Sequence, residues 1–211
     1  MKRILVVHAG PRVGWNTDRL IKEAAKGAES AGAQVEYIDL YRIGPFLGCR
    51  SCFACKRPES FGVCAYPDAL SEVLEKIRQA DGLILGSPNY LGNLSSGFRA
   101  LYERLVFQSL TYNKETPCCN THPIPVLLIM TSNCLEEGYE ANGYTALLEN
   151  YCKTLSAFVG PTQLLTCGNT LQVPDYSLYQ WTLFDPEAKK LHHDETFSRY
   201  LEQAFSLGAS L

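Results

Sequence analysis

Apolar residues along the chain follow two alternating patterns, one with the period of a strand and one with the period of a helix. Five short runs rich in aliphatic residues predict β-strands, at residues 2–7, 34–40, 83–85, 125–130 and 163–166. The first run is almost wholly apolar, as in a strand covered on both faces. The second alternates apolar and polar residues, which indicates a strand nearer the edge of the sheet.

Segments with helical spacing lie between these runs. Apolar residues recur at three- and four-residue intervals, as in single helix stripes, within residues 20–28, 70–77, 98–105 and 147–158. Asp68 precedes the second segment as an expected helix cap, and Gly160-Pro161 ends the last. Because strands and helices alternate, the sequence predicts an α/β fold whose parallel sheet has helices on both faces.

Composition and charge narrow the class of protein. A chain of 211 residues with 46% hydrophobic residues, 19% charged residues and a net charge of −3 is typical of a folded globular protein. We expect one domain over 1–211, with a Cys-rich insertion at 48–66 and an aromatic extension at 173–186. The mild charge predicts no nucleic-acid partner, and the absence of a long apolar run or leader predicts a cytoplasmic protein without a membrane partner.

The loop after the first strand has the composition of a phosphate site. Glycine and proline shape it at Gly10 and Pro11, and Arg12 offers a charge-assisted contact. Asn16 and Thr17 stand where the next helix begins, so their side chains and the free backbone N–H groups can surround a phosphate. The loop matches neither the dinucleotide nor the P-loop motif, which favours a monophosphate. The alternative is a plain strand-to-helix turn with a cap.

The loop after the third strand reads Ser-Pro-Asn-Tyr-Leu-Gly-Asn-Leu-Ser over residues 87–95. A flat, partly polar ring needs backbone donors at its heteroatoms and an apolar or aromatic surface against its face. A turn of this composition supplies both. Since ligands of open α/β sheets bind at the carboxyl ends of the strands, this loop and the phosphate loop belong to one expected site.

Both loops resemble those of the NADPH-dependent FMN reductases, whose motifs are S-P-x-Y-x-G-N-x-S and G-S-P-R-x-x-x-N-T. The resemblance implies a flavodoxin-like three-layer sandwich whose five parallel strands have the order 2-1-3-4-5, with non-covalent FMN as cofactor. Ala9-Gly10 stands where this family has Gly-Ser. The implied FMN residues are Gly10, Pro11, Arg12, Asn16 and Thr17 at the phosphate, Pro88, Asn89, Tyr90, Leu91, Gly92 and Asn93 at the isoalloxazine, and Thr131, Ser132 and Asn133 at the flavin edge.

Four of the nine cysteines form a C-x2-C-x2-C-x8-C array at Cys49, Cys52, Cys55 and Cys64. Such spacing turns successive thiolates toward one centre. The array resembles that of the iron–sulfur flavoproteins, a branch of the same superfamily, which implies a [4Fe-4S] cluster beside the flavin. A zinc ion, a reversible disulfide and a structural thiol-rich loop remain open alternatives.

The flavin carries the chemistry in this interpretation, so no catalytic side chain is expected. NAD(P)H would reduce FMN, and a quinone, flavin or similar acceptor would take the electrons. One alternative is a cluster that relays electrons from ferredoxin, and another is a flavodoxin-type carrier without turnover. The resemblance also implies a homodimer or homotetramer. His8 is expected to shape the first loop, and His192-His193 to lie on a solvated helix face.

Overall fold

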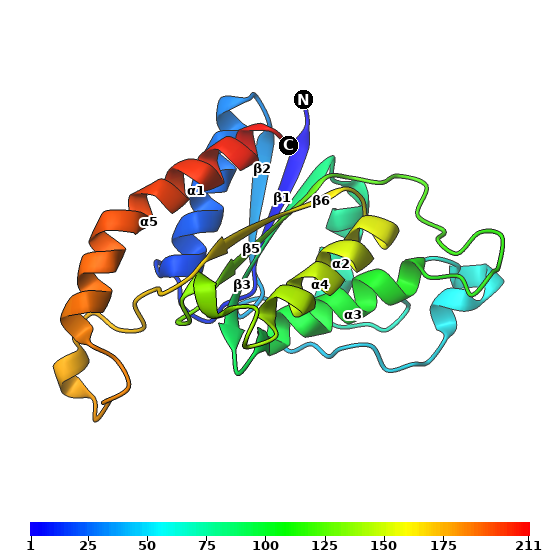
Figure 1. Ribbon diagram of the computed structural model, residues 1–211. Helices are drawn as coiled ribbons and strands as arrows, with labels where there is room; N and C mark the ends of the chain where they lie inside the picture. The colour runs from blue at the N-terminus through cyan, green and yellow to red at the C-terminus, as the bar shows by residue number, and fades with distance from the viewer.

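A parallel sheet forms the middle layer of the protein (Figure 1). The computed structural model describes residues 1–211, and its parallel strands run in the order β2-β1-β3-β5-β6. This confirms the predicted order, with one addition: a two-residue strand, β4, pairs antiparallel with β3 and is too short to leave a pattern in the sequence. The strands are β1 (Arg3–His8), β2 (Gln34–Asp39), β3 (Gly82–Tyr90), β4 (Asn93–Leu94), β5 (Val126–Thr131) and β6 (Thr162–Cys167).

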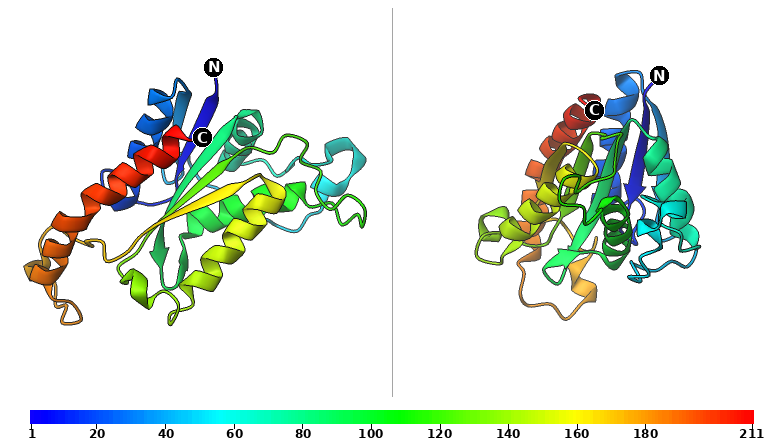
Figure 2. Two further views of the ribbon diagram at one scale, coloured as in Figure 1. Left: turned by 45° about the horizontal axis from the view of Figure 1, so that its top comes forward. Right: turned by 90° about the vertical axis from the view of Figure 1, so that its right-hand side faces the viewer.

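Helices cover both faces of the sheet, as the alternating pattern predicts. Two of them, α1 (Asn16–Ser30) and α5 (Pro186–Ala209), cover one face (Figures 1 and 2). The opposite face carries α2 (Ala69–Gln79), α3 (Ser96–Ser109) and α4 (Tyr144–Phe158). Single turns of 3-10 helix lie in the connections, η1 (Ala54–Lys56), η2 (Pro58–Ser60), η3 (Glu136–Gly138) and η4 (Tyr176–Leu178).

Each face of the sheet has its own apolar core. Leu5 and Val7 of β1 face the core beneath α2, α3 and α4, whereas Ile4 and Val6 face the core beneath α1 and α5. All four side chains are buried, which explains the unbroken apolar run of this strand. By contrast, β2 lies at the sheet edge and is only partly buried, in agreement with its alternating sequence.

Helix ends follow the expected chemistry at α2. The Asp68 carboxylate accepts a hydrogen bond from the Leu70 N–H at 2.9 Å, and the Ser71 hydroxyl accepts one from the Asp68 N–H at 3.2 Å. This reciprocal pair is a capping box, and it confirms Asp68 as the N-cap.

The sequence predicted a helix face at His192-His193 but not the bounds or the packing of the C-terminal helix α5. It packs against α1 with almost no space between the backbones: a Cβ on Gly208 would lie 1.9 Å from the Ala24 carbonyl oxygen. One on Gly27 would lie 2.0 Å from the Phe205 carbonyl oxygen. Small residues rather than a broad apolar stripe therefore make this contact, so the helix leaves a weak hydrophobic pattern.

The carboxyl ends of β1, β3, β5 and β6 meet at one edge of the sheet, the lower edge in Figure 1. The Cys-rich segment 48–66 and the aromatic segment 173–186 lie at opposite sides of the molecule in both Figure 1 and the left view of Figure 2. None of the helices is both long and apolar enough to span a membrane.

Candidate functional site

A cleft of about 520 Å³ opens at the carboxyl edge of the sheet. Its size is in the range of pockets that hold cofactors. Of the fourteen predicted FMN residues, all line it except Gly92 and Asn93. Five further residues were missed from the sequence: His8, Trp15, Thr170, Leu171 and Gln172.

The phosphate loop leads into the N-terminus of α1 without a capping side chain, because Trp15 stands at the N-cap position. The first-turn N–H groups therefore have no side-chain acceptor, and the helix dipole favours an anion there. Asp18 in the same turn is buried and points elsewhere, with Tyr37, Lys22 and the Gly14 N–H as donors. Burial would raise the pKa of Asp18, but these hydrogen bonds outweigh it and lower the pKa.

Residues 170–172, which follow β6, hold the phosphate loop in place. The Asn16 amide donates to the Leu171 carbonyl at 2.7 Å, the Trp15 indole N–H donates to the same oxygen at 3.1 Å, and the Arg12 guanidinium donates to the Gln172 carbonyl. Two of the predicted phosphate residues thus already have backbone acceptors. Residues 170–172 could have been predicted as site residues from their position alone, because they follow β6, which ends at the same edge of the sheet as the other strands.

The β3–β4 connection is a tight turn in which Leu91 and Gly92 both have positive φ, 53° and 80°. Asn89 accepts a hydrogen bond from the Gly92 N–H at 3.1 Å through its Oδ1, while its buried Nδ2 has no partner. Asn93 is turned away, because its Oδ1 accepts a hydrogen bond from the Tyr151 hydroxyl at 2.7 Å. Gly92 and Asn93, which were predicted to contact the ring, therefore do not line the cleft.

The end of β5 and the loop after it contribute three predicted residues to another wall of the cleft. The Thr131 hydroxyl is 2.7 Å from that of Thr17, which joins this wall to the phosphate loop. Asn133 accepts a hydrogen bond from the Lys189 ammonium of α5 at 2.7 Å. Ser132 is buried, and its carbonyl accepts a hydrogen bond from the Thr170 hydroxyl at 2.9 Å.

His8 lies at the end of β1, beside the first loop, where the sequence places it. Its side chain is completely buried, and neither ring nitrogen has a partner within hydrogen-bond distance, although the Nδ1 lies 3.8 Å from the Asp39 carboxylate. Burial lowers the pKa of His8, although the carboxylates of Asp18 and Asp39 act in the opposite direction. A Cβ on Gly10 would lie 2.9 Å from the His8 Nε2, so the imidazole fills the space beside this glycine.

The buried side-chain nitrogens that lack a hydrogen-bond partner belong to two residues, His8 and Asn89, and both line the cleft. Such groups cost free energy unless a ligand or water pairs with them. A ligand with an anionic group at one end and polar ring atoms at the other matches the free helix N-terminus and these nitrogens. The residues present fit FMN by this test.

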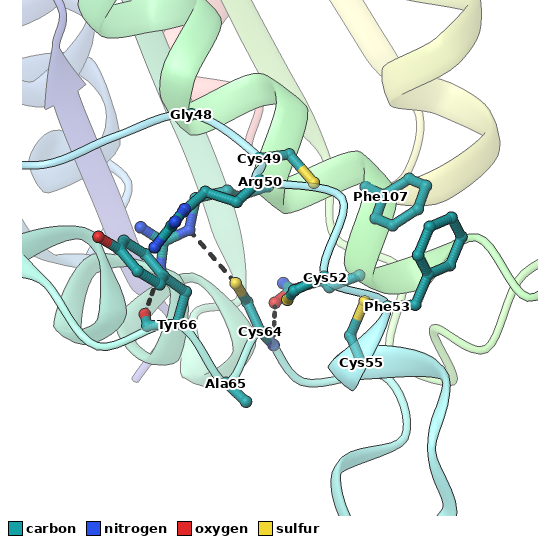
Figure 3. Close-up of a pocket in the computed structure, with 12 residues that line it drawn as sticks. Gly48, Cys49, Arg50, Cys52, Phe53, Cys55, Cys64, Ala65, Tyr66 and Phe107 are labelled. Atoms are coloured by element: carbon teal, nitrogen blue, oxygen red, sulfur yellow. Dashed lines mark hydrogen bonds between the residues drawn. The ribbon is translucent and has the colours of Figure 1, made fainter.

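The four cysteines of the array line a second pocket, shown in Figure 3. Phe53 and Phe107 form an apolar wall, and the Arg104 guanidinium donates to the Cys64 sulfur at 3.3 Å. Burial raises the pKa of the Cys55 thiol. All nine cysteines are free thiols, and no three His, Cys, Asp or Glu side chains are placed to hold a single metal ion.

This cysteine pocket lies along the C-terminal half of α3, whereas the cleft adjoins its N-terminal end, where the Ser95 hydroxyl donates to the Ala9 carbonyl. The two pockets share no residue. About 15 Å of helix separates them, at 1.5 Å per residue. The resemblance implied a cluster directly beside the flavin. Within one chain, however, the cysteine array is separated from the cleft by most of the length of α3.

Comparison with known proteins identifies relatives of the chain. The chain is 33% identical over 104 residues to an iron–sulfur flavoprotein of Methanocaldococcus jannaschii, an alignment that covers 48% of this chain and 51% of that protein. The chain spans about half the length of the curated relatives it matches.

Two solved structures have the same fold over nearly the whole chain. An NAD(P)H:quinone oxidoreductase from Methanothermobacter marburgensis has a TM-score of 0.73 at 16% identity, covering 99% of this chain and 98% of that one. An FMN-dependent NADH-azoreductase from Bacillus anthracis, solved with FMN, has a TM-score of 0.66 at 14% identity, covering 99% and 100%.

The family model for NADPH-dependent FMN reductases matches residues 2–150, which contain three of the four loops of the cleft and the whole cysteine array. This match confirms the family that the two sequence motifs indicated. The chain belongs to the NADPH-dependent FMN reductase family, a family of FMN-dependent oxidoreductases.

Proposed function

We propose that this protein passes electrons from NAD(P)H to a small acceptor, such as a quinone or a flavin, through non-covalent FMN held in the cleft. The observation that carries this proposal is the set of unpaired, buried nitrogens on His8 and Asn89. A protein that did not bind a polar ligand there would gain nothing from burying them.

The proposed FMN orientation follows from the chemistry of the two ends of the cleft. The phosphate would lie at the N-terminus of α1, near Arg12, Asn16 and Thr17, where backbone N–H groups and a guanidinium favour an anion. The ring would then lie between residues 88–91 and 131–133, with Asn89 as a donor to its heteroatoms. Bound FMN supplies hydride acceptance and electron transfer, and the side chains bind, orient and limit access of water.

A second ligand can approach this ring from the open side of the cleft. Tyr90 and Leu91 are exposed at the rim, and Leu91 is fully exposed despite its apolar side chain. An exposed apolar rim beside a flavin suits the stacking of a nicotinamide or of a flat acceptor such as a quinone.

The test begins with an FMN titration of the purified chain, followed by oxidation of NADH and NADPH with a quinone acceptor. Asn89→Leu removes the unpaired donor, so we expect at least a tenfold weaker FMN affinity, equivalent to about 1.4 kcal/mol. Asn150→Leu, at an exposed position of α4, is the matched control and should bind FMN as the wild type does. A wild-type chain that binds no FMN would refute the proposal, and bound FMN without steady NAD(P)H oxidation would favour an electron carrier.

A second candidate function is that of an iron–sulfur flavoprotein, in which a cluster relays electrons between ferredoxin and FMN. Two observations favour it: the four cysteines line one pocket, and the curated relatives are iron–sulfur flavoproteins. The types of donor fit, because such clusters are held by four Cys thiolates and tuned by N–H donors to sulfur. The four thiols would have to move closer together around the cluster, since no three of them are placed to hold a single metal ion. Cys49, Cys52, Cys55 and Cys64 would be its ligands.

Anaerobic purification with iron and acid-labile sulfide assays tests this candidate separately from FMN binding. We expect about four iron atoms per chain for a [4Fe-4S] cluster. Cys52→Ser should lose the iron while FMN binding is retained, and Cys152→Ser on α4, outside the cysteine pocket, should keep both. Iron-free wild-type protein from strictly anaerobic cells would argue against the cluster and leave the FMN proposal intact.

A further inference from the structure

The cleft has a buried positive charge behind its wall that neither the sequence motifs nor the family match includes. Lys189 of α5 is only 5% exposed. Its ammonium donates to the side-chain oxygens of Asn133 and Asn169, both at 2.7 Å, and lies 5.3 Å from the centre of the Phe184 ring. Both asparagines belong to loops at the carboxyl edge of the sheet, and Asn133 lines the cleft.

This ammonium has no anionic partner in the protein. The other buried basic side chain, Arg104, is paired with the Asp68 carboxylate at 2.5 Å, whereas Lys189 has only neutral oxygens and an aromatic face around it. Burial lowers the pKa of Lys189 to about 8, so most of it is still charged at neutral pH. Buried charges are normally compensated, and an uncompensated one beside a ligand cleft indicates that the ligand brings the opposite charge.

Lys189 also fixes the orientation of Asn133. An ammonium only donates hydrogen bonds, so it must face the Oδ1 of Asn133, which leaves the NH₂ group of this amide free to donate elsewhere. No protein atom accepts from that NH₂ group at hydrogen-bond distance, and the residue forms part of the cleft wall. The contact therefore gives a cleft residue a defined donor for a ligand.

We propose that Lys189 is a positioning residue that holds Asn133 as a donor to the carbonyl edge of bound flavin, and whose charge offsets the negative charge of the reduced ring. This inference rests on the proposed FMN site. Hydride transfer from NAD(P)H adds two electrons and one proton to the neutral ring, which leaves one negative charge on it and releases NAD(P)⁺. A fixed cation behind the ring edge stabilises that reduced form more than the oxidised one.

The experiment compares the affinities of oxidised and reduced FMN through the midpoint potential of the bound flavin. Lys189→Met removes the charge and keeps an aliphatic chain of similar length, Lys189→Arg keeps the charge, and Lys190→Met is the matched control at the exposed neighbouring position. We expect Lys189→Met to weaken the binding of reduced FMN about tenfold more than the binding of oxidised FMN. This difference lowers the two-electron midpoint potential of the bound flavin by about 30 mV. Lys189→Arg should recover most of this loss, and Lys190→Met should show none.

Several outcomes would overturn the proposal. An unchanged potential in Lys189→Met with FMN bound would show that the charge does not act on the ring. An equal loss of affinity for both redox states, seen with FMN but not with riboflavin, would instead assign Lys189 to the phosphate. Lys189→Gln, which retains a donor, covers the case in which the methionine variant fails to fold. A wild-type chain that binds no FMN would defeat the proposed function itself, which is a distinct result.

Discussion

Replacing Gly10 by alanine tests whether His8 forms the floor of the cleft. The added Cβ would lie 2.9 Å from the His8 Nε2 and 3.2 Å from the Pro88 Cδ, both closer than side chains normally approach. Neither neighbour is the far end of a flexible chain, because the imidazole is completely buried and proline is a rigid ring. Overpacking of this kind costs about 1–3 kcal/mol, so the free energy of unfolding of the apoprotein should fall by about that amount. FMN affinity should also fall, because the two residues that the new Cβ displaces both line the cleft.

The cause of the loss can be isolated with a double-mutant cycle. His8→Ala removes the nitrogen that the new methyl group meets, so Gly10→Ala should cost at least about 1 kcal/mol less in that background. Fluorescence titration with FMN measures the affinity, and urea unfolding of the apoprotein measures the free energy of unfolding. Additive effects of the two substitutions, or wild-type FMN affinity in Gly10→Ala, would refute the idea that the imidazole occupies this space.

Three further predictions concern buried charges and close packing. Arg104→Met should lower the free energy of unfolding by about 3–5 kcal/mol in urea titrations, because it leaves the Asp68 carboxylate unpaired and largely buried. The wild type should gain stability relative to Lys189→Met as the pH rises. The difference between their free energies of unfolding should increase by about 3 kcal/mol between pH 8 and pH 10.5. The sign follows because the unfolded chain, with the ordinary lysine pKa, binds more protons in this range. Gly208→Ala should lower the thermal midpoint by several degrees, since its Cβ would overlap the Ala24 carbonyl, and an unchanged midpoint would contradict the α1–α5 packing described above.

The sheet could be predicted from the sequence because its signals are local. The aliphatic runs of β1 and β5 identify central strands, and the alternation in β2 identifies an edge strand. A strand buried on both faces has a continuous apolar run, whereas a strand buried on one face alternates apolar and polar residues. The capping residue Asp68 is equally local, because the groups it pairs with lie within three residues.

The parts of the cleft that were missed depend on contacts between distant segments. Lys189 bonds to Asn133, which is 56 positions away, and Trp15 bonds to the Leu171 carbonyl, which is 156 positions away. His8 reads as a polar residue after an apolar run, so its burial could not be inferred without knowing that β2 and β3 flank β1. The motifs identified the loops of this site and some of the side chains that join them, such as Asn16 and Thr17, but not the contacts those side chains make.

The backbone contact between α1 and α5 has a consequence for the order in which the protein is assembled. Chains emerge from the ribosome with the N-terminus first, so α1 forms before residues 186–209 exist. Until then the sheet face beneath it lacks Phe197 and Ala204, and its aliphatic side chains stay in water. Lys189 and the fixed orientation of Asn133 arrive with the same helix. Tight FMN binding should therefore require α5 to be packed on α1, and a chain truncated before residue 186 should bind FMN more weakly.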